Sequence, residues 1–578
     1  MPADANPEIR NLFVWMKYLL KEFSAWLMDA CLPHRKLLAG LRAQWGRQGS
    51  KDSWRESLYF DLVRHEFSGN CVDDRTWADL EFPTIFSRLD STVTPLGSQL
   101  LYRTLREYVE EPNELAEKYA VYDELRSSAS LREEIQLKLA ALQHESHANI
   151  AGLIFDDAPD TLKLQALLLL WGLTSFAVLI AVIALSWSIW IWLAIIAVNV
   201  VILWRTYWRV HRAIETLASC IQMMKLADRL ALMHKRHPSL PQLNRLAEET
   251  ANRAEMRKAL RGFAMMKSRN IEMFSVWFNL AFLTELIAFV HAADRFFQLR
   301  SKLVATFEAI GSLDAAIAIA SYLDSAPGHC QPVIVDSLLL NISDGYHPLL
   351  AHPVDNSICL EKRSALITGS NMAGKTTFIK MLGINILFAR TMGFCLASKA
   401  IIPRASVMAS VRGDHSVESG KSHYFSEIET IHSFIDKGRQ GEFTVFVIDE
   451  LFNGTNTLER IAAARAVLEV LCRNALVLVT THDVELQDCL VNRYELYHFQ
   501  EEPEVEGFFD YKLRRGAATD RNAIKLLERM GFPGDVVANA MAYASEDLNL
   551  SPRRSRGERA STHGVGSSRY GPLDADAP

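Results

Sequence analysis

The residues whose spacing is most clearly suited to chemistry run from Gly369 to Thr376. They read Gly-Ser-Asn-Met-Ala-Gly-Lys-Thr and fit G-x-x-x-x-G-K-[ST], a loop whose backbone N–H groups surround nucleotide phosphates. Lys375 would reach the β- and γ-phosphates, and the Thr376 hydroxyl would bind Mg²⁺. We therefore expect ATP and Mg²⁺ as ligands, with phosphate contacts from Gly369, Ser370, Asn371, Met372, Ala373, Gly374, Lys375, Thr376 and Thr377.

An acidic pair stands at the end of an apolar run further along the chain. Asp449 and Glu450 follow Thr-Val-Phe-Val-Ile, which is typical of a buried strand. Such a strand would carry both carboxylates to the edge of a sheet, where they are costly unless a cation lies nearby. We expect Asp449 to hold Mg²⁺ through water and Glu450 to orient or polarise the attacking water.

A histidine ends the next apolar run. His482 follows Val-Leu-Val-Thr-Thr, so it would lie at a neighbouring strand end and could donate a hydrogen bond to the γ-phosphate. A lone histidine is more often structural, and the functional interpretation depends on this position beside the other groups. We predict that Glu450, Lys375 and His482 form the catalytic set.

The elements that must position these groups are short strands that alternate with helices. Residues 364–368, 444–449 and 475–481 are β-branched runs, and a helix-forming segment follows Lys375 directly. A strand before the glycine-rich loop and a helix after it would aim the helix N-terminus at the phosphates. This alternation of short strands and helices predicts an α/β domain with a mostly parallel sheet. The domain follows a richly helical region of the chain.

These elements, in this order, resemble the ATPase domain of the MutS family of DNA mismatch repair proteins. The loop TGSNMAGKTT, the Asp-Glu-x-x-x-Gly-Thr-x-Thr pattern from Asp449 and the Thr-His pair at 481–482 resemble the family's motifs. Residues 84–325 resemble its helical core, or lever, only weakly. Further matches are His347 and Pro348 near the nucleotide, the stretch from Ser422 to Glu427, and a C-terminal strand and helix–turn–helix after Gly516.

The resemblance implies a homodimer of ATPase domains arranged head to tail. Groups that would then act near the partner's nucleotide are Ser422, Gly454, Thr455, Asn456 and Thr457. The chain also departs from the family pattern. The mismatch-reading Phe-x-Glu is missing from the first 90 residues, Phe452 and Asn453 replace a Gly-Arg pair, and Ala373 replaces a glycine. The resemblance therefore implies ATP binding and hydrolysis for this chain, but it does not imply mismatch recognition.

A long uncharged segment interrupts the helical region. No Asp, Glu, Lys, Arg or His occurs among the 41 residues from Leu164 to Trp204. This length fits two membrane-spanning helices with a turn at residues 186–188. Lys163 before the segment and arginines at 205, 209 and 212 after it place positive charge on both flanks, which favours both ends in the cytoplasm. We expect a two-span protein of the inner or cytoplasmic membrane with both termini cytoplasmic. A buried helical hairpin is the alternative. For a second apolar patch, 274–290, we expect a buried core helix.

Composition and boundaries complete the expected organisation. The chain has 578 residues, a net charge of −6, and eight cysteines without metal-binding spacing, which indicates reduced thiols in a cytosolic setting. The N-terminus does not resemble a secretory signal. The expected parts are a helical segment (1–80), a first core part (81–163), the transmembrane hairpin (164–204), a second core or lever part (205–329), the ATPase domain with its dimer contact (330–545) and a disordered tail (546–578).

Three functions remain open from the sequence. The first is a membrane-anchored MutS-like ATPase, dimeric and coupled to DNA, with basic runs at 233–238 and 253–269 as candidate DNA contacts; the same runs are also typical of a solvated helix face. The second is a nucleotide-gated membrane scaffold for protein partners, which the overall acidity favours. A transporter-type ATPase is disfavoured, because two spans are few and no LSGGQ-like signature lies before Asp449.

Overall fold

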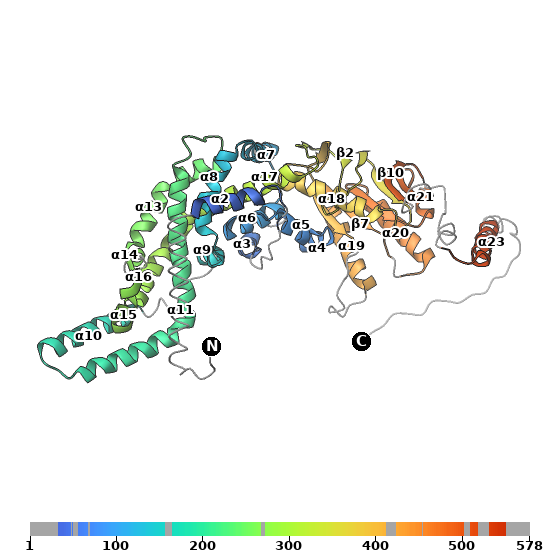
Figure 1. Ribbon diagram of the computed structural model, residues 1–578. Coiled ribbons are helices and arrows are strands. Elements are labelled where there is room, and N and C mark those ends of the chain that lie inside the picture. The colour runs from blue at the N-terminus through green and yellow to red at the C-terminus, as the bar shows by residue number, and fades with distance from the viewer. Residues whose placement is uncertain are drawn as a thin grey trace, which may run out of the picture.

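The computed structural model describes residues 33–47, 49, 56–67, 70–155, 165–266, 272–370, 372–411, 423–452, 455–501, 509–517 and 531–550. Helices form one end of an elongated molecule and two sheets form the other (Figure 1). One hydrophobic core runs through both parts, from Tyr59 in the helices to Phe509 in the sheets.

The described residues of the first part of the chain, up to Ser325, are mostly helical, as expected. Its elements up to the hairpin are α2 (Pro33–Gln44), α3 (Leu58–Val63), η1 (Arg64–Phe67), α4 (Asp74–Asp79), α5 (Phe82–Leu89), α6 (Pro95–Arg106), α7 (Pro112–Ser127), α8 (Ala129–Leu139), η2 (Ala140–Leu142), η3 (Glu145–Asn149) and α9 (Ile150–Phe155). Those that follow are α10 (Gln165–Ala184), α11 (Ile189–Ala231), α12 (Pro241–Glu248), α13 (Thr250–Ala259), α14 (Arg261–Met266), α15 (Glu272–Phe282), α16 (Thr284–Leu299), η5 (Arg300–Leu303) and α17 (Val304–Ser325).

Helix α6 begins at a Thr-Pro pair, residues 94 and 95. Thr94 is its N-cap and accepts a hydrogen bond from the Gly97 N–H, and Pro95 occupies the first turn. The fully buried carboxylate of Asp314 on α17 accepts hydrogen bonds from the N–H groups of Val93 and Thr94. Gly97 allows this approach, because a Cβ there would lie 2.3 Å from the Asp314 carboxylate. These contacts fasten α6 to α17, which leads directly into the sheets.

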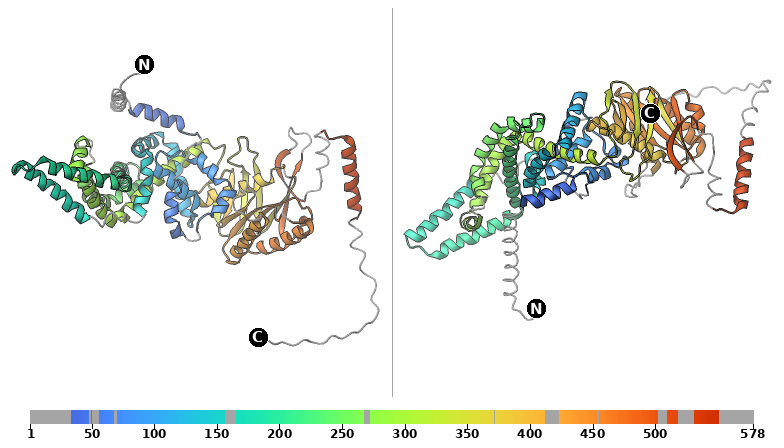
Figure 2. Two further views of the ribbon diagram at one scale, coloured as in Figure 1. Left: turned by 90° about the horizontal axis from the view of Figure 1, so that it is seen from below. Right: turned by 45° about the horizontal axis from the view of Figure 1, so that its top comes forward.

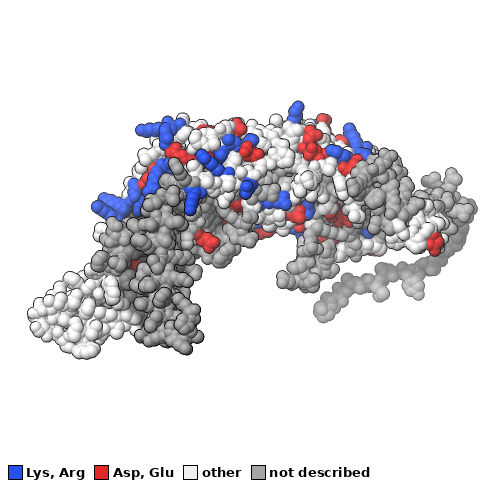
Figure 3. Space-filling view, in the orientation of Figure 1, with Lys and Arg blue, Asp and Glu red and all other residues white. Residues whose placement is uncertain are grey.

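The uncharged segment forms a helical hairpin, as expected. Helices α10 and α11 are joined by residues 185–188, where Ser186 has a φ of 53°. The hairpin extends from the body, and Figure 3 shows it as a lobe without charged side chains. The second helix does not end at 204. Helix α11 is 43 residues long and runs on to Ala231 in the helical core, because no proline or glycine interrupts residues 189–231.

Only one helical stretch among the described residues is long and apolar enough to cross a membrane on its own, Thr284–Ser325, and most of it is buried in the protein. The described apolar parts of the hairpin, Leu170–Ala184 and Ile189–Trp204, are shorter. Unlike Thr284–Ser325, these two helices expose many of their large apolar side chains, including Leu173, Ile183 and Trp190.

The expectation of one buried core helix over 274–290 is wrong. The chain breaks at Leu283, whose φ of 53° is left-handed, so that α15 and α16 are separate helices. Trp277 and Phe278 on α15 are exposed, whereas Leu286 and Phe289 on α16 are buried. The apolar residues of this segment therefore lie in two different environments: those of α15 on the surface and those of α16 in the protein core.

The second part of the chain is an α/β domain with two sheets. Its elements are β1 (Val333–Val335), β2 (Leu339–Gly345), β3 (Asn356–Glu361), β4 (Ser364–Thr368), α18 (Lys375–Thr391), β5 (Lys399–Pro403), β6 (Ser406–Ser410), α19 (His423–Arg439), β7 (Thr444–Asp449), α20 (Thr457–Leu471), β8 (Leu476–Thr481), α21 (Glu485–Leu490), β9 (Tyr494–Glu501) and β10 (Phe509–Arg515).

The larger sheet has the strand order β10-β9-β4-β8-β7-β6, and only the β10–β9 pair is antiparallel. This agrees with the mostly parallel sheet expected from the sequence. The smaller sheet, in the order β1-β5-β2-β3, is mixed and was not expected. Residues of α18 belong to the core shared with the helical part, and residues of α19, α20 and α21 form a second cluster on other sheet residues.

A last helix, α23 (Gly534–Leu550), stands apart from the sheets in both views of Figure 2. The boundary expected at 545 falls within this helix. The helix continues to Leu550 because no helix breaker occurs before Pro552. Most of the expected helix–turn–helix, residues 518–530, and the tail from Ser551 lie outside the described residues.

Candidate nucleotide site

The glycine-rich loop lies between the buried strand β4 and the start of α18. Gly369 and Gly374 both have positive φ, 143° and 95°. A Cβ on Gly369 would lie 2.8 Å from the Phe499 carbonyl oxygen, and a Cβ on Gly374 would lie 3.1 Å from the Tyr511 ring. Both positions therefore need glycine, for backbone conformation and for space.

Lys375, the first residue of α18, is nearly fully buried, with 2% of its side chain exposed. Its Nζ donates to the carbonyl oxygens of Gly369 at 2.7 Å and Ser370 at 2.9 Å, and lies 3.9 Å from Glu450 Oε1. Burial lowers the Lys375 pKa, and the carboxylates of Glu450 and Asp449 oppose this shift. Hydrogen bonds to the loop carbonyls thus hold the lysine in the loop, close to the carboxylates of Glu450 and Asp449.

Thr376 and Asp449 meet at the carboxyl edge of the larger sheet. The Thr376 hydroxyl donates to Asp449 Oδ2 at 2.8 Å, and the Thr480 hydroxyl at the end of β8 donates to Asp449 Oδ1. Two strands and a helix therefore bring a hydroxyl and a carboxylate together. Both are oxygen ligands of the kind that Mg²⁺ prefers.

Glu450 and His482 also come together, although 32 positions separate them in the chain. Glu450 Oε1 lies 3.4 Å from His482 Nδ1. Glu450 has a φ of 47° and its N–H donates to the Thr480 carbonyl, so the residue leaves the strand at a sharp turn. The same turn is held from α19, where Glu427 accepts the Phe452 N–H at 2.5 Å.

A bidentate ion pair supports the histidine loop. Arg460 on α20 donates to both carboxylate oxygens of Asp483, at 2.9 and 2.6 Å, and both side chains are largely buried. Asp483 Oδ1 lies 3.8 Å from His482 Nε2. This pair was not predicted from the sequence, because neither residue belongs to the glycine-rich loop, the acidic pair or the Thr-His motif.

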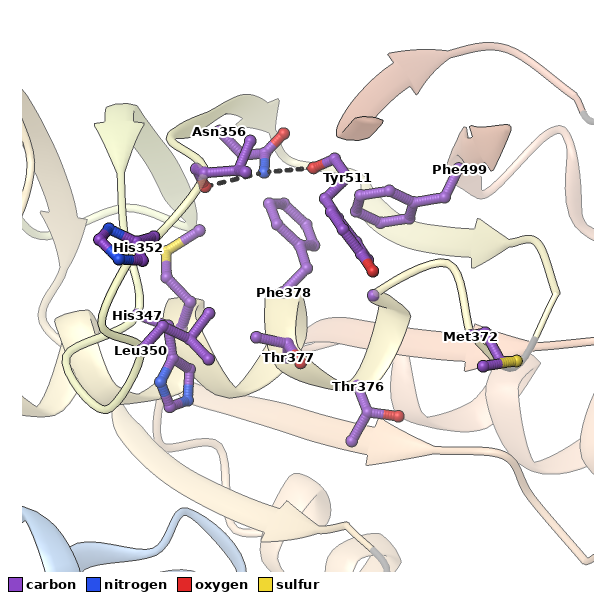
Figure 4. Close-up of a pocket in the computed structure, with 13 residues that line it drawn as sticks. His347, Leu350, His352, Asn356, Met372, Thr376, Thr377, Phe378, Phe499 and Tyr511 are labelled. Carbon is purple, nitrogen blue, oxygen red and sulfur yellow. Dashed lines mark hydrogen bonds between the residues drawn. The ribbon is translucent and has the colours of Figure 1, made fainter. Parts of the chain in front are cut away.

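A cavity of about 400 Å³ adjoins the loop (Figure 4). The rings of Phe378, Phe499 and Tyr511 lie together on one side of it, with Tyr511 nearest to Gly374. Asn356 fixes this wall, since its amide donates to the Tyr511 carbonyl at 2.9 Å and its oxygen accepts the Leu513 N–H. Other lining residues are His347, Leu350, His352, Val354, Met372, Thr376, Thr377 and Met381.

His347 and Pro348, expected near the nucleotide, lie at this cavity or beside it. His347 lines it and is 5% exposed, and burial lowers its pKa to about 4, with Lys380 and Arg88 adding to the shift. Pro348 is buried, and its carbonyl accepts a hydrogen bond from Arg88 on α5 at 3.1 Å. This contact links the helical part to the nucleotide cavity.

The groups expected to act near a partner's nucleotide are only partly described. Asn456 caps α20 by accepting the Glu459 N–H at 3.0 Å, and the Thr455 hydroxyl donates to Glu459. Their side chains thus have a structural task in this chain as well. Three expected site residues lie outside the described residues: Asn371, Ser422 and Gly454.

The structure also narrows the candidate DNA contacts. Arg253 is fully buried against Asp228 at 2.9 Å, and Arg257 pairs with the same carboxylate, so neither is a free surface charge. Figure 3 shows Lys and Arg side chains gathered on the upper left of the molecule, over the helical part. The exposed basic residues of these runs that the structure describes are Lys235, Arg236, Lys258 and Arg261.

Residues 365–548 match a family model described as MutS domain V. The chain is also similar to a DNA mismatch repair protein MutS from Aquifex pyrophilus, 27% identical over 267 residues, or 43% of this chain and 31% of that protein. An endonuclease MutS2 from Pelotomaculum thermopropionicum is 30% identical over 258 residues, 42% of this chain and 32% of that protein.

Thus the chain matches about a third of the length of these curated relatives. The matched region contains the glycine-rich loop, the acidic pair and the histidine. A mixed α/β domain preceded by a mostly helical region fits a MutS-like ATPase. The likenesses support a relation to the MutS family through this domain.

Proposed function

We propose that the chain is a membrane-anchored, MutS-like ATPase that binds and hydrolyses ATP as a homodimer and couples hydrolysis to DNA binding. The observation that carries the ATPase part is the meeting of Thr376 and Asp449 at 2.8 Å, directly after a loop that closes around Lys375. The relatives are named as a DNA mismatch repair protein and an endonuclease, and these names set the class of DNA process that we propose.

The described residues fit ATP with Mg²⁺. The Ser370 hydroxyl is buried in the loop without a hydrogen-bond partner in the structure, which suits a phosphate oxygen as acceptor. Among the described residues there is no cluster of three metal-ligating side chains, and Mg²⁺ commonly uses one or two protein oxygens with phosphates and water. Thr376 and Asp449 would hold the ion, which neutralises charge on the phosphates when bound.

The remaining groups take roles that their positions allow. Lys375 would turn from the loop carbonyls to the β- and γ-phosphates. Glu450 would accept a hydrogen bond from water and orient it, so that the water oxygen bonds to the γ-phosphorus as the bond to ADP breaks. His482, which lies 3.4 Å from Glu450, would donate to the γ-phosphate and so respond to its loss.

The cavity beside the loop suits the base of the nucleotide. Flat aromatic faces stack on flat bases, and Tyr511 and Phe499 present such faces. His347 has a pKa near 4, so it is neutral at physiological pH and offers no charge to the base.

Membrane anchoring is proposed through residues 164–204. Outward-facing Leu173, Ile183 and Trp190 would be costly in water and favourable in lipid. DNA contact is proposed for the exposed lever residues Lys235, Lys258 and Arg261.

The test is the steady-state ATPase rate of the detergent-solubilised full chain, with and without duplex, branched and single-stranded DNA, at low and high salt. Lys375→Ala, prepared identically, measures contaminating activity. We expect a rate well above that background and stimulation by one DNA form that weakens as salt rises, because phosphate contacts release counterions.

Two results would contradict the proposal at different points. A rate no higher than that of Lys375→Ala would reject the ATPase. A rate that no DNA form alters would reject DNA coupling and favour the scaffold for protein partners, which the net charge of −6 also suits.

A further inference from the structure

The break at Leu283 leaves backbone groups that need partners. The last carbonyls of a helix have no N–H of their own helix to bind, and α15 ends at Phe282. Water usually satisfies such groups. Here the hairpin satisfies them instead, although its sequence is almost entirely apolar.

Three hairpin side chains form a polar lock on the break. The Asn199 amide donates to the carbonyls of Leu280 at 3.1 Å and Ala281 at 2.8 Å, and the Ser175 hydroxyl donates to Ala281 at 2.6 Å. The Trp171 indole N–H donates to the Asn199 oxygen at 2.8 Å. Ser175 and Asn199 are both fully buried.

The contact is close as well as polar. A Cβ on Gly172 would lie 2.6 Å from Ile287 and 3.2 Å from the Phe282 carbonyl oxygen, so only glycine lets α10 approach the break this closely. The Phe176 and Phe282 rings meet edge to face at 5.8 Å. The hairpin and the α15–α16 break therefore form one packed unit.

The lock lies inside the uncharged part of the hairpin. Asn199 precedes the first following charge, Arg205, by six residues, or about 9 Å of helix. At that depth in a bilayer, irregular backbone is tolerated only where protein satisfies its polar groups, as the lock does. On α15 itself, Trp277 and Phe278 are 70% and 53% exposed.

From these observations we propose that α15 is a third lipid-contacting element, whose C-terminal end lies in the acyl-chain region beside the hairpin and is held there by the polar lock. This inference rests on the proposed membrane anchoring. Its ligand is the acyl chains of a bilayer, because a water-facing break would need no buried lock, and Trp277 and Phe278 continue the exposed apolar surface of the hairpin.

The charged residue Glu285 lies two residues after the break, and we place it at the edge of the acyl-chain region. It lies in the first turn of α16, where the helix N-terminus favours a negative charge. The Asn279 side chain accepts its N–H at 3.2 Å and donates to its carboxylate at 3.3 Å.

The test places a benzophenone-bearing amino acid at single positions of the full chain in phosphatidylethanolamine–phosphatidylglycerol vesicles. The positions are Trp277, Ile183 near the hairpin tip, and Leu232 at the far end of α11, which is 79% exposed. After irradiation, mass spectrometry detects adducts with acyl chains. We expect adducts at 277 and 183 and none at 232.

The outcomes separate the two proposals. Adducts at 183 without adducts at 277 would overturn the role of α15 and leave the hairpin anchor standing. No adducts at 183 would overturn both. Adducts at 232 at the level of 277 would mean that surface apolarity alone gives labelling, and would also overturn the inference.

A second variant tests the lock itself. Asn199→Leu removes the donors to Leu280 and Ala281 and keeps the hairpin apolar. We expect it to reduce the adducts at 277 severalfold while those at 183 persist. Thr174→Val is the matched control, because the Thr174 hydroxyl donates to the Leu170 carbonyl in its own helix. Unchanged labelling at 277 in Asn199→Leu would refute the lock.

Discussion

Single residues at the site have charge states that depend on burial. Lys375 is buried behind its loop with a lowered pKa, so the nearby Glu450 and Asp449 help to keep its charge. The two carboxylates therefore stabilise the charged form of Lys375 even before any ligand binds. It also means that the lysine and the acidic pair should be regarded as one electrostatic unit.

His347 predicts an acid-sensitive stability. Its pKa is about 4 in the folded chain against about 6.5 in an unfolded one, so the unfolded chain binds the proton more readily. The stabilisation is full above pH 6.5 and falls by about 3 kcal/mol as pH drops to 4. Thermal unfolding at pH 7.5, 5.5 and 4.5 should show this loss.

His347→Gln should flatten that pH dependence, with His432→Gln, an exposed histidine on α19, as the control. An equal pH dependence in wild type and His347→Gln would show that other groups cause the loss.

At this scale the sequence predicts the residues that belong to compact motifs. Lys375, Thr376 and Asp449 were expected together, and the structure places them together. Phe499, Tyr511 and Asn356 could not be found this way. Phe499 and Tyr511 come from the paired strands β9 and β10, whereas Asn356 comes from β3 in the other sheet. Its side-chain hydrogen bonds to Tyr511 and Leu513, about 155 positions later in the chain, bring these strands to one cavity.

At the scale of elements, the outer edge of β6 has an unusual cover. It is the last strand of the larger sheet, and side chains of the helical part bind its free N–H groups in place of another strand. Tyr108, Thr76 and Asp79 accept from Val407, Ala409 and Val411, each at 2.9 Å. This protects an edge that would otherwise be open to pairing.

Tyr108→Phe tests this cover, because it removes one hydroxyl and little volume. The buried Val407 N–H would then lack its acceptor, at a cost of about 1–3 kcal/mol in unfolding free energy. Tyr543→Phe on exposed α23 is the control, with an expected change near zero. Equal midpoints for both variants in thermal or denaturant unfolding would disprove the contribution.

The strands with continuous apolar runs were predictable to the residue, since Ser364–Thr368 and Thr444–Asp449 are buried along almost their whole length. The break at Leu283 was not. No glycine or proline marks it locally. The partners that satisfy it, Ser175 and Asn199, lie 106 and 81 residues before the carbonyls of Ala281 and Leu280 that they bind.

At the scale of the whole molecule, rigid helices connect the sheets to the hairpin. Helix α17 leads from the sheets toward α16, and α11 runs without interruption from the hairpin into the helical core (Figure 1). Movement of the ATPase domain would therefore reach the hairpin through packed helices. Such a connection gives nucleotide binding a physical route to the hairpin.

Deletion of residues 164–204 tests the anchor. The wild-type chain should stay in the membrane pellet after alkaline carbonate extraction, and the deletion variant should move to the supernatant, because α15 alone is too short to span. Deletion of 551–578 is the control and should not alter the pellet fraction. Carbonate resistance of the 164–204 deletion would exclude the hairpin as the anchor.

The central claim, that ATP is hydrolysed at the edge of the larger sheet, is tested most directly by Glu450→Ala. Nucleotide binding and single-turnover hydrolysis are measured on the same preparation of the full chain. We predict ATP affinity close to wild type and a hydrolysis rate lower by about 100-fold or more, because the water loses its orienting carboxylate. Hydrolysis at the wild-type rate would contradict the account.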